Sequence, residues 1–406
     1  MRYRFEDAEL DTDRFVLQVR GEPVPVEPQV FEVLAHLVRH RDRLVPRTEL
    51  LDTVWGNRFV SDAALASRVA AARAAVGDDG RAQRCIRTVH GRGLQFVADV
   101  EELGPEPPAR AGAPERDAPR QRVRFVAAPD GTRLAVATVG SGVPLVKAAN
   151  WLTHVEEDPR SPVWQHWLTG LGERFAYTRY DARGCGLSDR ELGDSDLTDP
   201  DTWVSDLEAV VDDVGADRFV LLGMSQGCVP ALAYAVRHPE RVAHLVLYGG
   251  YARGMALRGE ESAAQSETLQ QLIRGGWGGA NPAFRTVFTL TFLPAATSEQ
   301  VRWYDDLQRS CASVENAVRL ESAFHHVDVS ELAARLAVPT TVVHVRDDRA
   351  TPFDEGRRLA ALVPGAELVT LEGSNHVLTG DEPAWPEFLA LMERIRDEVT
   401  AAGQSG

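Results

Sequence analysis

The sequence predicts an α/β protein in two parts: an α+β winged helix-turn-helix over residues 1–100, and a doubly wound sheet with a helical lid over residues 122–400. Three observations predict this fold class. The first hundred residues contain stretches with helical periodicity, followed by a predicted β-hairpin with glycines at its turn. An apolar run, residues 218–222, leads directly into Gly-Met-Ser-Gln-Gly and a helical stretch. Two later apolar runs are predicted strands, and one is followed by an aspartate and the other by a histidine. Ligand sites of parallel sheets lie at these carboxyl ends of the strands.

The first part opens with short alternating strands, expected at residues 15–19 and 24–26, and three helices follow. Two of the helices carry apolar faces made of Val30, Phe31, Leu34, Leu37 and Val38, and of Leu50, Leu51, Val54 and Trp55. The third begins at the capping residues Ser61 and Asp62 and places Leu65, Val69, Ala72 and Val76 on one side. Residues 85–97 then predict a hairpin.

The hairpin carries the run Arg87-Thr-Val-His-Gly-Arg-Gly93 ahead of Phe96, which resembles the effector domains of OmpR/PhoB-type transcription regulators. In that family the third helix enters the major groove and the wing lies along the backbone or minor groove. The resemblance therefore implies double-stranded DNA as a partner. Because the groove-facing side of the third helix offers few base-reading side chains, modest specificity is expected from one module, improved by dimerisation on repeated half-sites. The candidate DNA-binding residues are Ser67, Arg68, Ala71 and Arg73 on the helix and Arg87, Thr88, His90 and Arg92 in the wing. A solvated helix face is the alternative interpretation of these arginines.

Charge separates the two parts. Residues 1–100 hold 15 Arg and 15 Asp and Glu, so the whole formal net charge of −16 lies in the remainder. An acidic body repels phosphate, and any nucleic-acid contact is therefore expected from the first part. Residues 101–121, rich in proline, alanine and charge, predict a semi-rigid linker.

Composition also excludes several classes of protein. The start of the chain has no apolar signal segment and no run reaches membrane-spanning length, so a cytoplasmic protein with no membrane partner is expected. Its four cysteines, Cys85, Cys185, Cys228 and Cys311, are scattered and predicted to be free thiols. No metal-ligand spacing and no phosphate-binding or dinucleotide glycine motif occurs, so neither a metal nor a cofactor is predicted.

The motif Gly223-Met-Ser-Gln-Gly227 stands between a predicted strand and a helix over residues 228–237. This is the context in which G-x-S-x-G forms a nucleophile elbow. The turn is so tight that the positions two before and two after the serine must lack a side chain, and both are glycine. Ser225 is therefore predicted to be a nucleophile exposed above the edge of the sheet.

The general base and the acid are expected downstream of the serine, because this kind of site orders its residues Ser, acid, His. A strand over residues 340–345 ends near Asp347 and Asp348, and one over residues 367–371 ends near His376. Serine needs a base to take its proton, and the imidazole needs a carboxylate to fix its tautomer. Asp348 is preferred over Asp347, which is placed to cap the turn or pair with an arginine. A loop histidine that caps backbone is the alternative for His376.

A further signature precedes the elbow, where a strand over residues 175–180 leads into Asp181-Ala-Arg-Gly-Cys-Gly-Leu-Ser-Asp189. Together these motifs, in this order, resemble the α/β-hydrolases over roughly residues 122–400. In that family the loop 181–189 is mostly scaffold, so Arg183 and Ser188 are not assigned to catalysis.

The oxyanion hole departs from the family's common pattern. Many relatives carry His-Gly after the third strand, whereas residues 144–149 are followed here by Asn150 and Trp151. The backbone N–H of Asn150 or Trp151 is expected to act with that of Gln226. His154 is either part of the pocket or a packed loop histidine, and the second interpretation is preferred.

Residues 251–338 leave the sheet pattern for a helical insertion, the usual place for a lid. Phe284, Phe288 and Phe292 recur every four residues and mark one face of a helix. Most of these rings are expected to pack the lid on the sheet. One or two ligand-facing rings would favour an apolar or mixed small molecule over a sugar or phosphate.

The preferred interpretation is a one-component DNA-binding regulator whose hydrolase-like domain senses a small ester, lactone or related acyl compound. This interpretation holds whether or not the Ser-His-Asp triad also turns the compound over. Linkage supplies the physical basis, because a ligand that prefers one conformation or dimer state shifts DNA affinity. The alternative is an esterase-like serine hydrolase with an accessory or vestigial DNA-binding domain. In a third reading, the triad geometry persists but the pocket serves only as a receptor.

Overall fold

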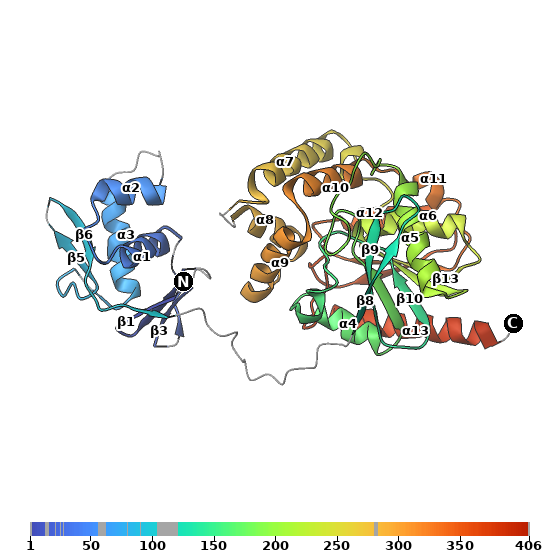
Figure 1. Ribbon diagram of the computed structural model, residues 1–406, viewed down its shortest axis with the longest axis horizontal. Coiled ribbons are helices and arrows are strands. Elements are labelled where there is room, and N and C mark those ends of the chain that lie inside the picture. The colour runs from blue at the N-terminus through green and yellow to red at the C-terminus, as the bar shows by residue number, and fades with distance from the viewer. Residues whose placement is uncertain are drawn as a thin grey trace. The chain divides into compact units, whose positions relative to one another are not determined.

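The computed structural model describes residues 2–12, 16–20, 22–24, 26, 28–55, 62–78, 80–89, 91–103, 121–279 and 283–404. The chain divides into two compact units, residues 1–114 and 115–406 (Figure 1). Each unit buries hydrophobic clusters of its own. No helix in the described part of the chain combines the length and apolar character needed to cross a bilayer.

The first unit is a small sheet, three helices and a hairpin. The antiparallel sheet has the order β4-β3-β2-β1-β7, with β1 (Arg2–Phe5), β2 (Ala8–Asp11), β3 (Val16–Val19), β4 (Glu22–Pro23) and β7 (Glu101–Leu103). The remaining elements are α1 (Pro28–Arg39), α2 (Arg47–Trp55), α3 (Asp62–Ala75), β5 (Ile86–Val89) and β6 (Gly93–Phe96). The apolar residues predicted to face inward on α1 and α3 are all buried, which confirms those two helix faces.

Strands β1, β2 and β7 were not predicted from the sequence, and the strand expected at residues 24–26 was wrong, since β4 spans Glu22–Pro23. Strands β1 and β2 form a hairpin, and β7 pairs with β1 in antiparallel register. Strand β7 falls inside the predicted linker, residues 101–121, so the start of that segment belongs to the first unit. Residues 104–120 of the predicted linker lie outside the described residues. A three-residue strand with two glutamates has no apolar signal of its own, and its partner lies at the other end of the domain.

The second unit is built on an eight-stranded sheet of order β15-β14-β13-β12-β10-β11-β9-β8. The strands are β8 (Arg122–Ala127), β9 (Arg133–Val139), β10 (Pro144–Lys147), β11 (Ala176–Tyr180), β12 (Phe219–Met224), β13 (Val242–Tyr248), β14 (Thr340–Val345) and β15 (Glu367–Leu371). Strand β9 is antiparallel to β8 and β11, and the other neighbouring pairs are parallel. The carboxyl ends of β10, β12, β14 and β15 therefore meet at one edge of the sheet.

Helices cover both faces of this sheet. Alternate residues of β12 enter different clusters: Val220 and Leu222 join one, and Phe219 and Leu221 join the other. The first cluster includes residues of α4 (Gln165–Gly172) and α13 (Ala384–Gln404). The second includes residues of α5 (Pro200–Val214), α6 (Cys228–Arg237), α11 (Ser330–Ala333) and α12 (Phe353–Leu362). Burial on both faces explains why these strands read as continuous apolar runs.

The segment between β13 and β14 forms the predicted helical lid. It comprises η3 (Met255–Leu257), α7 (Glu260–Gly276), α8 (Ala283–Phe292), α9 (Ser298–Cys311) and α10 (Val314–His326), and Figure 1 shows α7 to α10 gathered on one side of the unit. The ring centroids of Phe284 and Phe288 lie 6.2 Å apart, and those of Phe288 and Phe292 lie 5.0 Å apart. This confirms that the three rings share one face of α8.

Candidate active site

Ser225 lies on the bend that joins β12 to α6. Its φ of 54° is in the left-handed region, which is a strained conformation for a residue with a side chain. A Cβ on Gly223 would lie 2.7 Å from the Cα of Cys228, and one on Gly227 would lie 3.0 Å from the carbonyl oxygen of Ala148. Gly223 is thus required sterically, as the motif predicts, whereas a side chain at Gly227 would need the Ala148 carbonyl to shift by a few tenths of an ångström.

Asp348 and His376 follow β14 and β15 and lie side by side. Nδ1 of His376 is 2.6 Å from Oδ2 of Asp348, and both side chains are buried. The Asp348 carboxylate also accepts the backbone N–H groups of Ala350 and Thr351 through Oδ1. Held in this way, it fixes the imidazole with Nε2 pointing away from the acid. The alternative acid, Asp347, is exposed.

Backbone contacts also position the histidine ring. The His376 N–H donates to the Phe292 carbonyl, and the His376 carbonyl accepts from the Tyr248 hydroxyl. Gly249 lies against the ring, because a Cβ there would come within 2.9 Å of the ring carbon Cε1. Among the described residues Nε2 of His376 has no hydrogen-bond partner, so it does not bond to Ser225 Oγ.

The side chain of Gln226 lies between Ser225 and Trp151. In the amide orientation that satisfies both ends, Nε2 donates to Ser225 Oγ over 2.7 Å. Oε1 accepts from the backbone N and the indole Nε1 of Trp151, each over 3.0 Å. Of the two backbone donors expected after β10, the Trp151 N–H is therefore the one that donates to the Gln226 side chain, which itself contacts the serine.

The side chain of Asn150 holds the loop that follows β10. Its Oδ1 accepts from the Lys147 ammonium, and its Nδ2 donates to the Trp151 carbonyl over 3.1 Å. Lys147, the only lysine in the chain, is buried at the end of β10 with its ammonium over the Trp164 ring. Burial lowers its pKa to about 8, and Asp158 opposes that shift.

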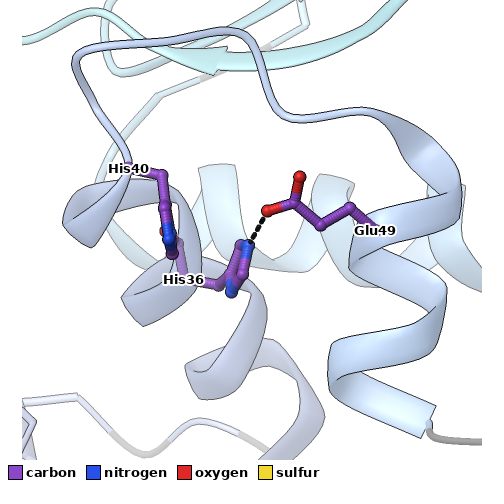
Figure 2. A group of neighbouring side chains, drawn as sticks. All are labelled: His36, His40 and Glu49. Atoms are coloured by element: carbon purple, nitrogen blue, oxygen red, sulfur yellow. Dashed lines mark hydrogen bonds and ion pairs between the residues drawn. The ribbon is translucent and has the colours of Figure 1, made fainter.

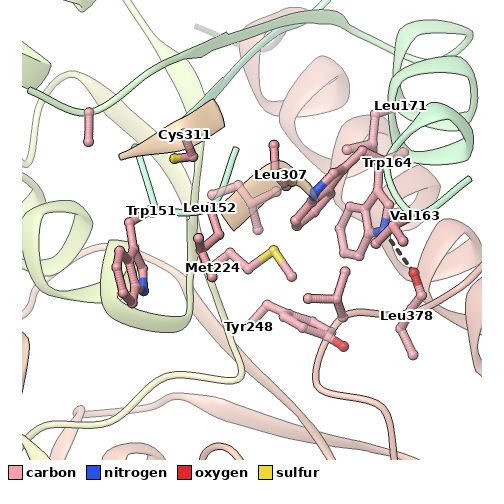
Figure 3. Close-up of a cluster of buried hydrophobic side chains, with 14 of the residues drawn as sticks. Trp151, Leu152, Val163, Trp164, Leu171, Met224, Tyr248, Leu307, Cys311 and Leu378 are labelled. Atoms are coloured by element: carbon pink, nitrogen blue, oxygen red, sulfur yellow. Dashed lines mark hydrogen bonds between the residues drawn. The ribbon is translucent and has the colours of Figure 1, made fainter. Parts of the chain in front are cut away.

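Two adjoining cavities meet at the serine. The smaller, of about 10 Å³, is lined by both Ser225 and His376. The larger, of about 70 Å³, opens beside Ser225 and Gln226 and runs under the lid. Its apolar wall includes Trp151, Leu269, Phe288, Phe292 and Phe324. Figure 3 shows Trp151 at the margin of the buried cluster that contains Met224 and Tyr248.

Polar side chains also line the larger cavity. His325 contacts Glu321 through Nε2 over 3.1 Å and Ser266 through Nδ1 over 2.7 Å. The Arg258 guanidinium stacks over Tyr251, and its Nε donates to the Arg253 carbonyl. The same Nε lies 3.8 Å from Glu355 Oε2, whereas neither terminal nitrogen of Arg258 bonds to a described residue. Burial lowers the pKa of this group. Sequence reasoning missed Arg258 and Glu321, because nothing in the lid pattern marks them.

The residues that were set aside from catalysis have structural partners. Arg183 forms a buried bidentate pair with Asp206, over 2.8 and 2.5 Å. Ser188 donates to the Asp181 carbonyl and accepts the Ala135 N–H. His154 is buried in its loop and lines neither cavity. These positions agree with a scaffold role for the loop and a packed His154.

The structure separates the candidate DNA-binding residues into two groups. Ser67, Arg87, Thr88 and Arg92 are exposed, Arg68 and Ala71 are half-buried, and His90 lies outside the described residues. Arg73 is buried, and its guanidinium donates to the Ile86 carbonyl and to Thr88 Oγ1. Arg73 thus joins α3 to β5, and we withdraw it as a phosphate contact.

Within the described part of the chain, one group of side chains has the composition of a metal site. Ligand atoms of His36, His40 and Glu49 lie within 4.8 Å of one another (Figure 2). Arg43 already donates to both oxygens of Glu49, over 2.8 and 2.6 Å, and His36 contacts the same carboxylate over 2.8 Å. The Arg43 hydrogen bond is the main cause that lowers the pKa of Glu49 to about 2. A guanidinium beside the carboxylate opposes a metal cation, so the group is explained as an ion-pair network between α1 and α2.

Comparison with protein families and curated proteins gives two kinds of match. Residues 159–383 match the family described as alpha/beta hydrolase fold, and residues 21–96 match that described as transcriptional regulatory protein, C terminal. The AB hydrolase superfamily protein YisY of Bacillus subtilis is 25% identical over 256 residues, 62% of this chain and 91% of that protein. The 2-hydroxy-6-oxononadienedioate/2-hydroxy-6-oxononatrienedioate hydrolase of Klebsiella pneumoniae is 28% identical over 254 residues, 61% and 82% of the two chains.

Solved structures show the same fold. The esterase EaEST from Exiguobacterium antarcticum superposes with a TM-score of 0.58 at 23% identity, over 68% of this chain and 100% of that one. The enol-lactonase from Burkholderia xenovorans gives a TM-score of 0.51 at 21% identity, over 67% and 99%.

Proposed function

Because the chain belongs to the alpha/beta hydrolase fold family and carries an OmpR/PhoB-type DNA-binding domain, we propose that it is a one-component transcriptional regulator. Its hydrolase domain binds a small ester, lactone or related acyl compound and cleaves it through Ser225, His376 and Asp348. Trp151 and Gln226 supply the backbone donors of the oxyanion hole. The protein acts in the cytoplasm on double-stranded DNA, as a monomer or a homodimer.

The observation that carries this proposal is the Asp348–His376 pair beside an elbow serine at the mouth of a lidded cavity. An imidazole fixed by a carboxylate can accept the serine proton, while the oxyanion donors hold the carbonyl oxygen. The second unit thereby supplies a ligand site, and the first supplies the DNA surface of Ser67, Arg87 and Arg92. A ligand that prefers one conformation of the whole chain shifts DNA affinity by that preference.

The lining of the cavity indicates the substrate class. Aromatic rings and Ser225 line it together with Arg258, whose terminal nitrogens bond to no described residue, although its Nε lies 3.8 Å from Glu355 Oε2. The curated relative from Klebsiella pneumoniae is named for a dioate, a compound with two carboxylates. We therefore propose an acyl compound that carries a second, anionic group which Arg258 binds.

Arg258 should set the preference for such compounds. In Arg258→Gln, kcat/KM for mono-p-nitrophenyl succinate should fall roughly 10-fold relative to p-nitrophenyl butyrate, since a charge-assisted hydrogen bond is lost. The exposed Arg274 of α7 provides the matched control, Arg274→Gln, which should leave the ratio unchanged. An equal loss on both esters would show that Arg258 only supports the lid.

The regulatory part of the proposal is tested with Ser225→Ala. DNA affinity of the full chain is measured by fluorescence anisotropy at fixed salt, with and without mono-p-nitrophenyl succinate, for the parent and the variant. Binding should shift DNA affinity within the usual range for allosteric coupling, roughly 5- to 150-fold. If ligand binding is sufficient for signalling, Ser225→Ala should lose ester cleavage and keep the ligand-dependent shift in DNA affinity.

Two other outcomes separate the competing functions. Cleavage by the parent with no change in DNA affinity would indicate a serine hydrolase with an accessory DNA-binding domain. A shift in DNA affinity with no cleavage of any ester in a broad panel would indicate a pure receptor.

A further inference from the structure

The Gln226 carboxamide has the shape and polarity of the acyl group that the site is proposed to bind. Its carbonyl oxygen accepts the Trp151 backbone N–H, one of the two donors proposed for the oxyanion, over 3.0 Å. Its nitrogen lies 2.7 Å from Ser225 Oγ. The side chain thus fills the position of a substrate carbonyl.

In the same structure the serine makes no hydrogen bond to its base. Ser225 Oγ accepts from Gln226, while Nε2 of His376 is buried and has no partner among the described residues. Both residues nevertheless line the smaller cavity, and a movement that brings the two side chains together would form the bond. General-base activation needs that bond, and this arrangement is therefore a closed state.

Trp151 extends the contact into the lid. Its ring stacks on Trp277 at the end of α7, with centroids 5.3 Å apart and planes 5° apart. Phe288 of α8 meets it edge-on at 5.9 Å. Displacing the Gln226 oxygen would remove two hydrogen bonds from Trp151, whose ring contacts Trp277 after α7 and Phe288 of α8. A ligand in the acyl site thereby acts on the lid.

We propose that Gln226 is a self-inhibiting side chain: its carboxamide occupies the acyl site of the resting protein, and an acyl ligand must displace it, which releases Trp151 toward the lid. This inference rests on the proposed function, because it requires Ser225 and Trp151 to form the acyl site. It assigns Gln226 a positioning role through its side chain, in addition to its backbone donor.

The test measures how fast Ser225 reacts with a fluorophosphonate probe, in which Oγ bonds to phosphorus as fluoride leaves and His376 takes the proton. In Gln226→Ala the labelling rate should rise roughly 10-fold, the equivalent of one or two hydrogen bonds. Gln226→Glu should lower it, because a carboxylate keeps the contact to Trp151 and places negative charge in the oxyanion site. The exposed Gln265 of α7 gives the matched control, Gln265→Ala, with no change.

A second measurement separates this inference from the proposed function. The indole N–H resonance of Trp151, identified by its loss in Trp151→Phe, should move in Gln226→Ala and stay in place in Gln265→Ala. Slower or unchanged labelling of Gln226→Ala would overturn self-inhibition and show that Gln226 only supports Trp151. An indole resonance that does not move would overturn it as well. A moved resonance without labelling of Ser225 in any variant would support the Gln226 contact and refute the hydrolase.

Discussion

Replacing Asp348 with asparagine should lower kcat for a p-nitrophenyl ester by about 10³–10⁴-fold, with little change in KM. The carboxylate lies 2.6 Å from Nδ1 of His376, and it keeps that nitrogen protonated so that Nε2 is free to act as the base. An asparagine amide that donates to Nδ1 selects the wrong tautomer. It also removes the negative charge that balances the imidazolium as it forms.

Asp347 provides the matched control for this experiment, because it is adjacent, acidic and exposed. Asp347→Asn should retain kcat within a few-fold. Thermal unfolding of both variants shows whether lost turnover reflects lost structure, since Asp348 also accepts the N–H groups of Ala350 and Thr351. A reversed result, with loss in Asp347→Asn alone, would mean that the acid has been assigned to the wrong neighbour.

The bounds of the strands near the site could be read from short runs of apolar and β-branched residues, although β14 is buried throughout and the edge strand β15 is partly exposed. Strands 340–345 and 367–371 and helix 228–237 were predicted with the bounds that the structure shows. Continuous apolar runs have sharp edges there, and the polar residues that follow them are the candidate site residues. By contrast, β7 could not be found, since its pairing with β1 rather than its own composition makes it a strand.

The positions of individual side chains were less accessible to sequence reasoning. Motif order predicted which residues would meet, and Asp348 and His376 do so. The residue pattern of the third helix did not predict that the Arg73 side chain is buried, because its partners, Ile86 and Thr88, belong to a later strand. The orientation of Gln226 likewise depends on Trp151, which follows a different strand. Contacts between segments that are distant in the sequence determine the orientation of these side chains. Such contacts cannot be deduced directly from a single sequence.

Lys147→Met should raise the free energy of unfolding at pH 7 by about 1–3 kcal/mol, because replacing a buried charge with an apolar side chain of similar length is often stabilising. The ammonium is buried at the end of β10, and burial lowers its pKa from 10.5 to about 8. The increase in the free energy of unfolding is reduced by the loss of the Lys147 hydrogen bond to Asn150. That contact holds the loop of Trp151, so the stabilised variant should lose kcat.

The pH dependence has a definite sign. Below about pH 8 the lysine is protonated in both states, and the folded state bears the full cost of the buried charge. Between pH 8 and 10.5 the unfolded chain binds a proton that the folded chain does not, so the stability of the parent rises with pH relative to Lys147→Met. Urea unfolding at pH 7, 8.5 and 10 should therefore show the difference between the two proteins shrinking as pH rises. If the variant is less stable by the same amount at every pH, the ammonium is a net stabilising group and its pKa is not lowered.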